Sequence, residues 1–330
     1  MIKHLKLNTI PLLFYILSLL FISQFLYQTI QSSFYAPNFL WTTFTLIISL
    51  LIFLGLREEF QPTKKKIKSP KKEYNLSNRV KILGVITLNT MLTYFIATYF
   101  GTSTIFSANF VCFISTFIFP RFEAEAYSGS LAGMIGAYLC SHWSIALLTA
   151  IMTGITFILF IPYFKNIGGR GGTIPYMATM VSVRLVLSLN PEQRQPIESE
   201  FIIPSLFAIL IGALLTYFLQ DKNLLSGVKA ATSISLIAAI LLPATLYTVT
   251  TAIFAGTVIG MSKKDRIEGY GHLFVVAIIS FILFIPSFHI LDGIGGKIGF
   301  LSLLSYQASI GLRKMITYSA EFMTSKQKYI

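Results

Sequence analysis

The sequence predicts an all-α polytopic membrane protein with about twelve transmembrane helices. Of its 330 residues, 54% are hydrophobic and 14% aromatic, and only 12% are charged, whereas soluble domains carry about 25% charged residues. The apolar residues form long uncharged runs, and several short landmarks occur twice in the same order. Composition therefore predicts the membrane class, the runs predict the helices, and the duplication predicts their grouping.

The first two uncharged runs, residues 10–27 and 39–56, are long enough to cross a bilayer core of about 30 Å as helices. A secretory signal peptide is the alternative for the first run, but no clear small-x-small cleavage site follows it. Ten further spans are expected at 82–99, 103–119, 124–140, 143–163, 172–190, 201–219, 225–242, 244–262, 270–287 and 298–313.

Basic residues predict the orientation of these spans. Nine Lys and Arg residues lie from Arg57 to Lys81, and a short basic loop between two spans belongs on the cytoplasmic side. Counting onward, only Arg184, Arg194 and Lys297 of the 26 Lys and Arg residues fall in the outer half or outside. We expect a plasma-membrane protein, such as one of a bacterial inner membrane, with both termini in the cytoplasm.

The same basic loop decides which partners are expected. Lysine clusters beside a span are typical contacts of anionic lipid headgroups. We therefore expect the lipid bilayer, with anionic lipid at the loop, as the partner of this charge, and no nucleic acid.

An internal duplication divides the rest of the chain. Five landmarks recur at offsets of 123 or 124: 92–95 with 215–218, Pro120 with Pro243, Gly133 with Gly256, 157–162 with 281–286, and 169–174 with 293–298. We therefore expect two N-terminal helices with the basic loop (1–80), a first five-helix repeat (81–200) and a second (201–330).

Five spans per repeat is an odd number, so the second repeat enters the membrane from the opposite side. The two repeats are then related by a pseudo-two-fold axis in the membrane plane, the inverted topology of many secondary transporters. The two-plus-5+5 arrangement resembles several transporter folds and the urea-channel fold, a likeness of form that does not assign function.

The third span of each repeat follows a proline and is rich in Gly, Ser and Thr. Small residues three or four apart favour close helix packing in lipid. The same residues are typical of a broken helix that lines a polar site near the bilayer midplane, and both interpretations stay open. The candidate substrate-binding residues are Ser128, Gly129, Ser130, Gly133, Thr250, Thr251, Gly256 and Thr257.

A glycine-rich turn follows the fourth span of each repeat. It is either a tight connector or a hinge or gate, with a basic residue on each face of the membrane. A Walker phosphate loop needs another spacing and a preceding strand, so nucleotide binding is not expected. The candidate gate or hinge residues are Gly169, Arg170, Gly171, Gly172, Gly293, Gly295, Gly296 and Lys297.

Three ionisable residues fall inside or at the start of spans, where charge is costly and usually paired or functional. Glu123 and Glu125 begin a third span, where the helix dipole favours acidic side chains. Arg184 is able to snorkel to the outer interface. The functional alternatives are a proton- or cation-coupling carboxylate at Glu125 and an anion or counter-ion site at Arg184.

No set of residues has the spacing of a metal site or of a hydrolase nucleophile, and Cys112 and Cys140 lie in apolar segments. We expect no enzyme activity, no metal and no cofactor. The expected function is a secondary transporter or permease for a small polar or anionic solute. The alternatives are a passive channel with the same pseudo-symmetric pore and a non-transporting subunit of an envelope complex. A homo-oligomer is left open.

Overall fold

The computed structural model describes residues 18–32, 39–60, 76–136, 139–140, 142–161, 163–186 and 196–327. All regular secondary structure in these ranges is helical, and they contain no β-strand. The expected all-α class is therefore confirmed. Residues 1–17, which include 10–17 of the first expected span, and residues 61–75 of the basic loop lie outside the described residues.

Residues 18–32 are helical. The helices that follow are α2 (Phe39–Phe60), α3 (Leu76–Tyr99), α4 (Thr104–Ile118), α5 (Glu123–Ala132), α6 (Trp143–Phe160), α7 (Arg170–Met180), α8 (Ser199–Asp221), α9 (Gly227–Leu241), α10 (Tyr247–Gly260), α11 (Tyr270–Ser287) and α12 (Lys297–Gln327). A π-helical turn, η1 (Val181–Val186), continues α7, and a 3-10 turn, η2 (Ala244–Leu246), precedes α10.

In the described ranges, four helices are long and apolar enough to cross a membrane: α3, α6, α8 and α11. Four apolar helical segments are shorter, at Trp41–Arg57, Thr104–Ile118, Gly227–Leu241 and Ala244–Gly260. The structure is thus that expected of a helical membrane protein, but it does not give twelve full spans. The helix at α5 stops at Ala132, before Gly133, and α7 contains Pro175 and changes to a π-helix at Val181, so these two expected spans are not continuous α-helices.

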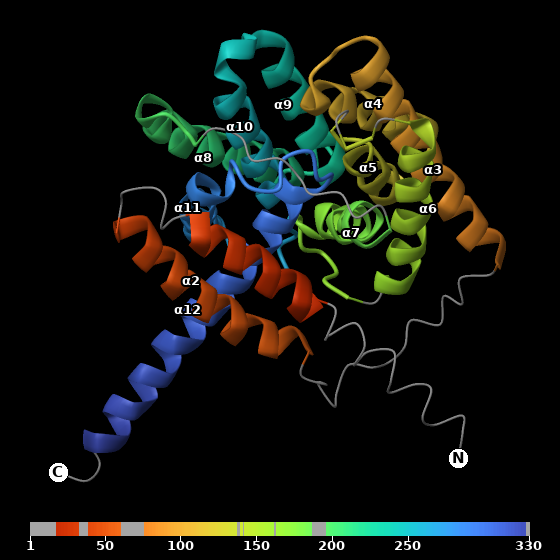
Figure 1. Ribbon diagram of the computed structural model, residues 1–330. Coiled ribbons are helices and arrows are strands. Elements are labelled where there is room, and N and C mark those ends of the chain that lie inside the picture. Colours follow the sequence, from red (N-terminus) through yellow and green to blue (C-terminus); the bar gives the residue numbers. More distant parts are fainter. Residues whose placement is uncertain are drawn as a thin grey trace.

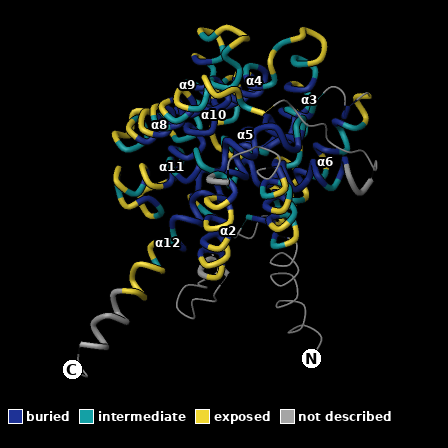
Figure 2. The backbone as a smooth tube through the Cα atoms, turned by 60° about the vertical axis from the view of Figure 1, so that its left-hand side comes forward, coloured by how far each residue is buried: buried dark blue, intermediate teal, exposed yellow. Residues whose placement is uncertain are grey.

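The outward faces of the long helices are apolar. On α8, the side chains of Ile203, Phe207 and Ile211, spaced four residues apart, are 66%, 57% and 52% exposed. Residues at this spacing lie on one side of a helix. Exposed residues surround a buried interior in Figure 2. A stripe of large exposed apolar side chains is unfavourable in water and is suited to lipid contact.

The helices form two groups side by side. In Figure 1, α3 and α6 lie on one side and α8 and α11 on the other, with α4 and α9 adjacent at the top of the view. Helices α7 and α12 also pack together between the groups. Helix α2 packs along α12, where the carbonyl oxygens of Gln307 and Leu51 fill the space beside Gly55 and Gly311.

The two groups have the same internal contacts. Helix α3 contacts α4, α5 and α6, and α8 correspondingly contacts α9, α10 and α11. Helix α5 contacts α4, α6 and α7, and α10 contacts α9, α11 and α12. Equivalent serines begin α4 and α9: the Oγ atoms of Ser103 and Ser226 each accept a hydrogen bond from a backbone N–H three residues later, at 3.2 Å, a common helix N-cap.

Candidate functional site

The contacts at the boundary between the two groups come in pairs. In each pair, the equivalent residues of the two groups change places. A Cβ atom placed on Gly168 would collide with the carbonyl oxygen of Val258 in α10. One placed on Gly295 would lie 2.6 Å from the carbonyl oxygen of Leu131 in α5. Gly295 and Val258 each stand 127 positions after Gly168 and Leu131. The two close approaches are therefore equivalent: each becomes the other when the two groups are interchanged.

Two backbone hydrogen bonds repeat this exchange. The N–H of Gly136 donates to the oxygen of Gly293 at 2.9 Å, and the N–H of Lys263 donates to the oxygen of Asn166 at 3.0 Å. The offset is again 127 in both pairs. Asn166 and Gly293 also share a positive φ, of 64° and 72°. Reciprocal contacts of this kind are what a two-fold relation produces.

The structural register differs from the register of the sequence landmarks. The hexapeptide at 157–162 starts three residues before the end of α6, whereas its copy at 281–286 starts six residues before the end of α11. Equivalent positions in this part are 127 residues apart, not 124. In this register the segment Gly-Gly-Arg-Gly-Gly at 168–172 matches Gly-Gly-Lys-Ile-Gly at 295–299, so Arg170 is the counterpart of Lys297.

Arg170 and Lys297 have the same role in the two groups. The guanidinium of Arg170 donates to the oxygens of Phe160 and Ile161 at the end of α6, both at 3.3 Å. The ammonium of Lys297 donates to the oxygens of Phe288 and Ile290 after α11, at 2.9 and 2.8 Å. Carbonyl groups at a helix end lack partners within the helix. Both expected gate cations therefore bind such carbonyls.

The glycines directly before these two cations, Gly169 and Gly296, also form close contacts between the two groups. A Cβ atom on Gly169 would meet the backbone nitrogen of Leu303, and one on Gly296 would lie 2.7 Å from the backbone nitrogen of Tyr176. These two contacts are also exchanged at an offset of 127. Gly171 instead faces the ring of Tyr127 in α5, 2.8 Å from an ideal Cβ.

The glycines of the expected substrate set lie between helices. A Cβ atom on Gly129 would lie 2.5 Å from the oxygen of Ile86 in α3, and one on Gly133 would lie 2.5 Å from that of Thr90. Gly256 makes the equivalent contact with Ile209 in α8. These positions allow α5 and α10 to approach α3 and α8 closely, as small residues do in membrane helices.

The hydroxyl residues of the expected set are all buried, and two of them also line cavities. Ser130 donates to the oxygen of Tyr127, and Thr257 donates to that of Phe254. Ser128 is buried, and its Oγ has no hydrogen-bond partner in the described part of the chain. Thr250 and Thr251 donate to the oxygens four residues earlier, at 3.2 and 2.8 Å, and both line cavities.

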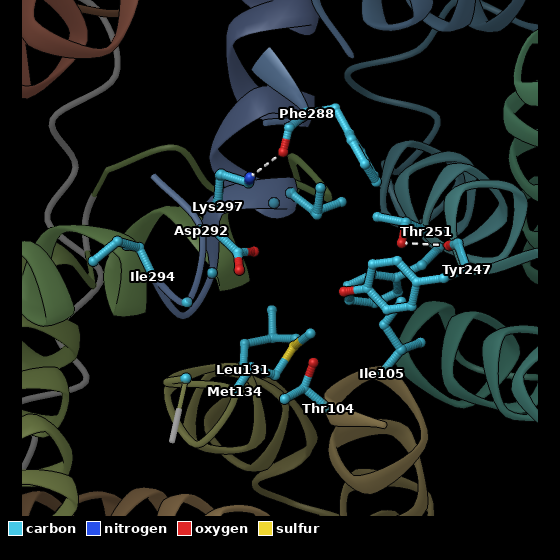
Figure 3. Close-up of a pocket in the computed structure, with 16 residues that line it drawn as sticks. Thr104, Ile105, Leu131, Met134, Tyr247, Thr251, Phe288, Asp292, Ile294 and Lys297 are labelled. Carbon is cyan, nitrogen blue, oxygen red and sulfur yellow. Dashed lines mark hydrogen bonds between the residues drawn. The ribbon is translucent and has the colours of Figure 1, made fainter. Parts of the chain in front are cut away.

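The main cavity, of about 270 Å³, lies at the boundary of the two groups. It is lined by the start of α4, the end of α5, the start of α10 and the loop before α12 (Figure 3). Thr251, Gly293, Gly296 and Lys297 are the residues of the sequence-based site sets that line it. Sequence patterns did not single out Thr104, Tyr247 or Asp292, which supply the other polar groups of the wall.

A second hollow, of about 600 Å³, lies where the equivalent residues of the opposite groups meet. Its lining residues Asn166, Gly227 and Lys263 are the counterparts of Gly293, Thr104 and Gly136 around the main cavity, at offsets of 127 for the loop residues and 123 for the helix start. The polar groups of the two hollows differ: Asp292 lines the main cavity, whereas its counterpart Lys165 is not among the residues that line the second hollow. The fold therefore provides two equivalent hollows with different chemistry.

One edge of the boundary is closed by a polar contact between α5 and α9. The Oγ of Ser226 donates to Glu123 at 2.6 Å, and Glu123 pairs with Lys229 at 3.3 Å, with side-chain exposures of 18% and 24%. The Lys229 ammonium also lies 5.1 Å from the ring centre of Phe117 in α4. We call Glu123, Ser226 and Lys229 the latch.

The residues equivalent to the latch carry no charge and cannot form an ion pair. The counterparts of Glu123, Ser226 and Lys229 are Thr250, Ser103 and Phe106, and these three residues line a cavity of about 360 Å³. That cavity shares Tyr247 with the main cavity. An ion pair therefore lies beside the hollow of about 600 Å³ at one end of the boundary, and the three counterpart residues line a cavity of about 360 Å³ at the other end.

The other charged candidates lie away from the main cavity. Glu125 is half-buried in the first turn of α5 and interacts electrostatically with Arg170. Arg184 belongs to η1, and its side chain lies outside the described part of the chain. Among the residues that the structure describes, no group of three His, Cys, Asp or Glu side chains is arranged to hold a metal ion.

Comparisons of the chain with protein-family models, with curated proteins and with solved structures find no match. The class that the fold defines is a helical membrane protein with helices of spanning length.

Proposed function

We propose that this protein is a secondary transporter for a small polar solute, built from two inverted five-helix units, residues 81–200 and 201–330. The observation that carries the proposal is the exchange of contacts at the boundary, represented by Gly168 with Val258 and Gly295 with Leu131. A two-fold pair of units with an odd number of spans places equivalent hollows toward opposite faces of the membrane. Alternating access needs such a pair.

The loop contacts support the inverted arrangement. The segments expected inside contact one another across the units: Asn166 donates to Asp265 at 2.7 Å, and Arg266 donates to the oxygen of Lys165 at 2.9 Å. The segments expected outside also meet, through the hydrogen bond from Gly136 to Gly293. An odd number of spans in each unit places the first pair of segments on the inner side of the membrane and the second pair on the outer side.

The difference between the two ends supports a carrier in one of its two states. The latch lies beside the hollow of about 600 Å³ at the end that we place on the inner side, whereas the main cavity and its neighbour around Thr250, which have no ion pair across the groups among their described lining residues, lie at the end that we place on the outer side. In the other state, the latch would separate and the outer end would close. A passive channel would need both ends open together.

Flux in proteoliposomes tests this proposal. We expect uptake of a labelled solute to be accelerated by the same unlabelled solute inside the vesicles, and to respond to a pH or sodium gradient. A channel would give neither counterflow nor accumulation, and a non-transporting subunit would give no flux. Cysteines at Glu123 and Lys229 joined by a short cross-linker should stop exchange, and cleavage of the linker should restore it. Exchange that continues with the cross-link in place would contradict alternating access.

A further inference from the structure

The wall of the main cavity carries one charge of each sign. Among the described residues that line it, Asp292 and Lys297 are the only Asp, Glu, Lys, Arg or His side chains, and Figure 3 shows both on the same side of the space. The formal charges of a carboxylate and an ammonium cancel. This cancellation holds whichever groups bind the two side chains, because a hydrogen bond to a neutral group removes no charge from the wall.

An ion that enters such a space gains no net attraction from the wall. Most of the remaining lining is apolar, and it includes Ile105, Leu131, Phe254 and Phe288. These side chains cannot replace the water that an ion loses on entry, and moving a charge out of water is costly unless an opposite charge compensates it. Since the charges of the wall cancel, the cavity disfavours cations and anions alike.

Uncharged hydrogen-bonding groups also line the cavity. The hydroxyl of Thr104 points toward the space from the start of α4 (Figure 3). The hydroxyl of Thr251 donates its proton to the oxygen of Tyr247 at 2.8 Å, and the lone pairs of a donating hydroxyl still accept. The two threonines therefore suit a polar group that both donates and accepts.

Helix ends of both polarities border the same space. The lining includes Thr104, Tyr247 and Lys297, the first residues of α4, α10 and α12, and Leu131 in the last turn of α5. The N–H groups at a helix start and the carbonyl groups at a helix end lack partners within the helix and carry opposite partial charges. Such ends suit the two poles of an uncharged dipolar group.

We propose that the main cavity binds a small uncharged polar solute with a short apolar body and excludes ions of either sign. The polar group of the solute forms hydrogen bonds with Thr104 and Thr251, and its body contacts Phe254 and Phe288. The volume of about 270 Å³ limits the solute to a small molecule. This inference rests on the proposed transport function and narrows its solute to uncharged molecules, so it departs from the anionic solute that the sequence left open.

The test uses four probes of the same chain length that differ in charge: butyramide, n-butylammonium, butyrate and the zwitterion 4-aminobutyrate. In a full-length variant with Met134→Cys and without Cys112 and Cys140, we measure how each probe slows the reaction of the cavity cysteine with N-ethylmaleimide, an uncharged reagent. We expect butyramide to slow the reaction at concentrations at least tenfold lower than each charged probe. Calorimetry on the wild type should give the same ranking without any substitution.

Changing the charge of the wall should change this ranking in a defined direction. Asp292→Asn leaves a positive wall and should strengthen butyrate by about tenfold or more, because an uncompensated charge then attracts the ion. Lys297→Gln should do the same for butylammonium, and the double variant should return both ions to their wild-type weakness. Glu268→Gln removes a carboxylate that pairs with Arg313 and is not among the cavity residues, and it should change no ranking.

The wild-type ranking decides by itself where a charge variant does not fold. Protection by any charged probe at the same or a lower concentration than butyramide, or no protection by any of the four, would overturn the inference. An Asp292→Asn variant that folds and binds butyrate as weakly as the wild type would also overturn it. Butyramide binding without exchange flux in proteoliposomes would leave this inference standing and remove the transport proposal, whereas exchange flux of an ion and not of butyramide would do the opposite.

Discussion

Gly172 and Gly299 face each other across the boundary of the two helical groups, each as the nearest neighbour of the other. A Cβ atom placed on either glycine would lie 2.5 Å from the Cα atom of its partner. The two residues are 127 positions apart, so each is the counterpart of the other, and a two-fold axis relating the groups would pass between them. The centre of the molecule thus has room for hydrogen atoms only.

Adding one methyl group at this centre should therefore destabilise the protein. We expect Gly172→Ala and Gly299→Ala each to lower the free energy of unfolding by about 1–3 kcal/mol, the usual cost of overpacking, and to slow exchange. Thermal unfolding in detergent measures the first effect. Gly84→Ala in α3 is the matched control, because nothing lies within 4 Å of its ideal Cβ and alanine is the better helix former. Unchanged stability of both centre variants would contradict the close approach.

The latch should contribute coupling energy between the two groups. Glu123→Gln and Lys229→Met remove the charges of a pair that is largely buried, and we expect a coupling of about 0.5–1.5 kcal/mol in a double-mutant cycle of unfolding. The exposed pair of Arg313 and Glu268 is the control, since exposed ion pairs contribute about 0–1 kcal/mol. Equal coupling in the two cycles would mean that the latch is an ordinary surface contact.

The side of the membrane on which each loop lies can be determined by labelling. In a background without Cys112 and Cys140, Lys222→Cys and Thr245→Cys are both at exposed positions. We expect an impermeant thiol reagent applied outside intact cells to label position 245 and not position 222. Labelling of both, or the reverse pattern, would disprove the inverted parity.

Stability should depend on pH through His289. Its side chain is 9% exposed, and its Nδ1 has no hydrogen-bond partner in the described part of the chain. Burial, and secondly the nearby Lys297 ammonium, lowers the pKa of His289 from its ordinary value. The unfolded chain then binds the proton first, so stability is present above a pH of about 6.5 and falls as the pH drops below it.

Melting temperatures between pH 7.5 and 5 measure this effect. The loss on acidification should be smaller in His289→Gln than in the wild type, whereas His142→Gln, at an exposed position, should keep the wild-type dependence. Parallel curves for the wild type and His289→Gln would show that burial of this ring does not oppose its protonation.

Much of the fold followed from the sequence. Runs without charge predicted helices, and the all-α class is confirmed. The duplicated landmarks predicted two five-helix repeats, residues 81–200 and 201–330, and this division stays a prediction. The exact register did not follow. In an apolar chain, identical hexapeptides such as those at 157–162 and 281–286 do not identify equivalent positions, because the contacts of the two helices are fixed by glycines and by the cations that bind their ends.

Less of the candidate cavity could be predicted. The Gly, Ser and Thr pattern identified α5 and α10, yet Gly129, Gly133 and Gly256 lie against neighbouring helices, and only Thr251 of that set lines the main cavity. Asp292 lies next to a glycine-rich turn, and the sequence does not identify it as a site residue, because a single acidic residue in a loop forms no pattern. Its position became informative only when three distant segments were brought together.

The stretch between the end of α9 and Phe254 is four residues longer than the stretch between the end of α4 and Tyr127. This difference changes where α10 begins relative to α5. The four additional residues carry the start of α10 back by about one turn, to Tyr247, which lines the main cavity. The corresponding position in the other group is Pro120, in the connector between α4 and α5. The extra residues thus give one group a cavity residue that the other group lacks, while the paired contacts of Gly168 with Val258 and of Gly295 with Leu131 are kept.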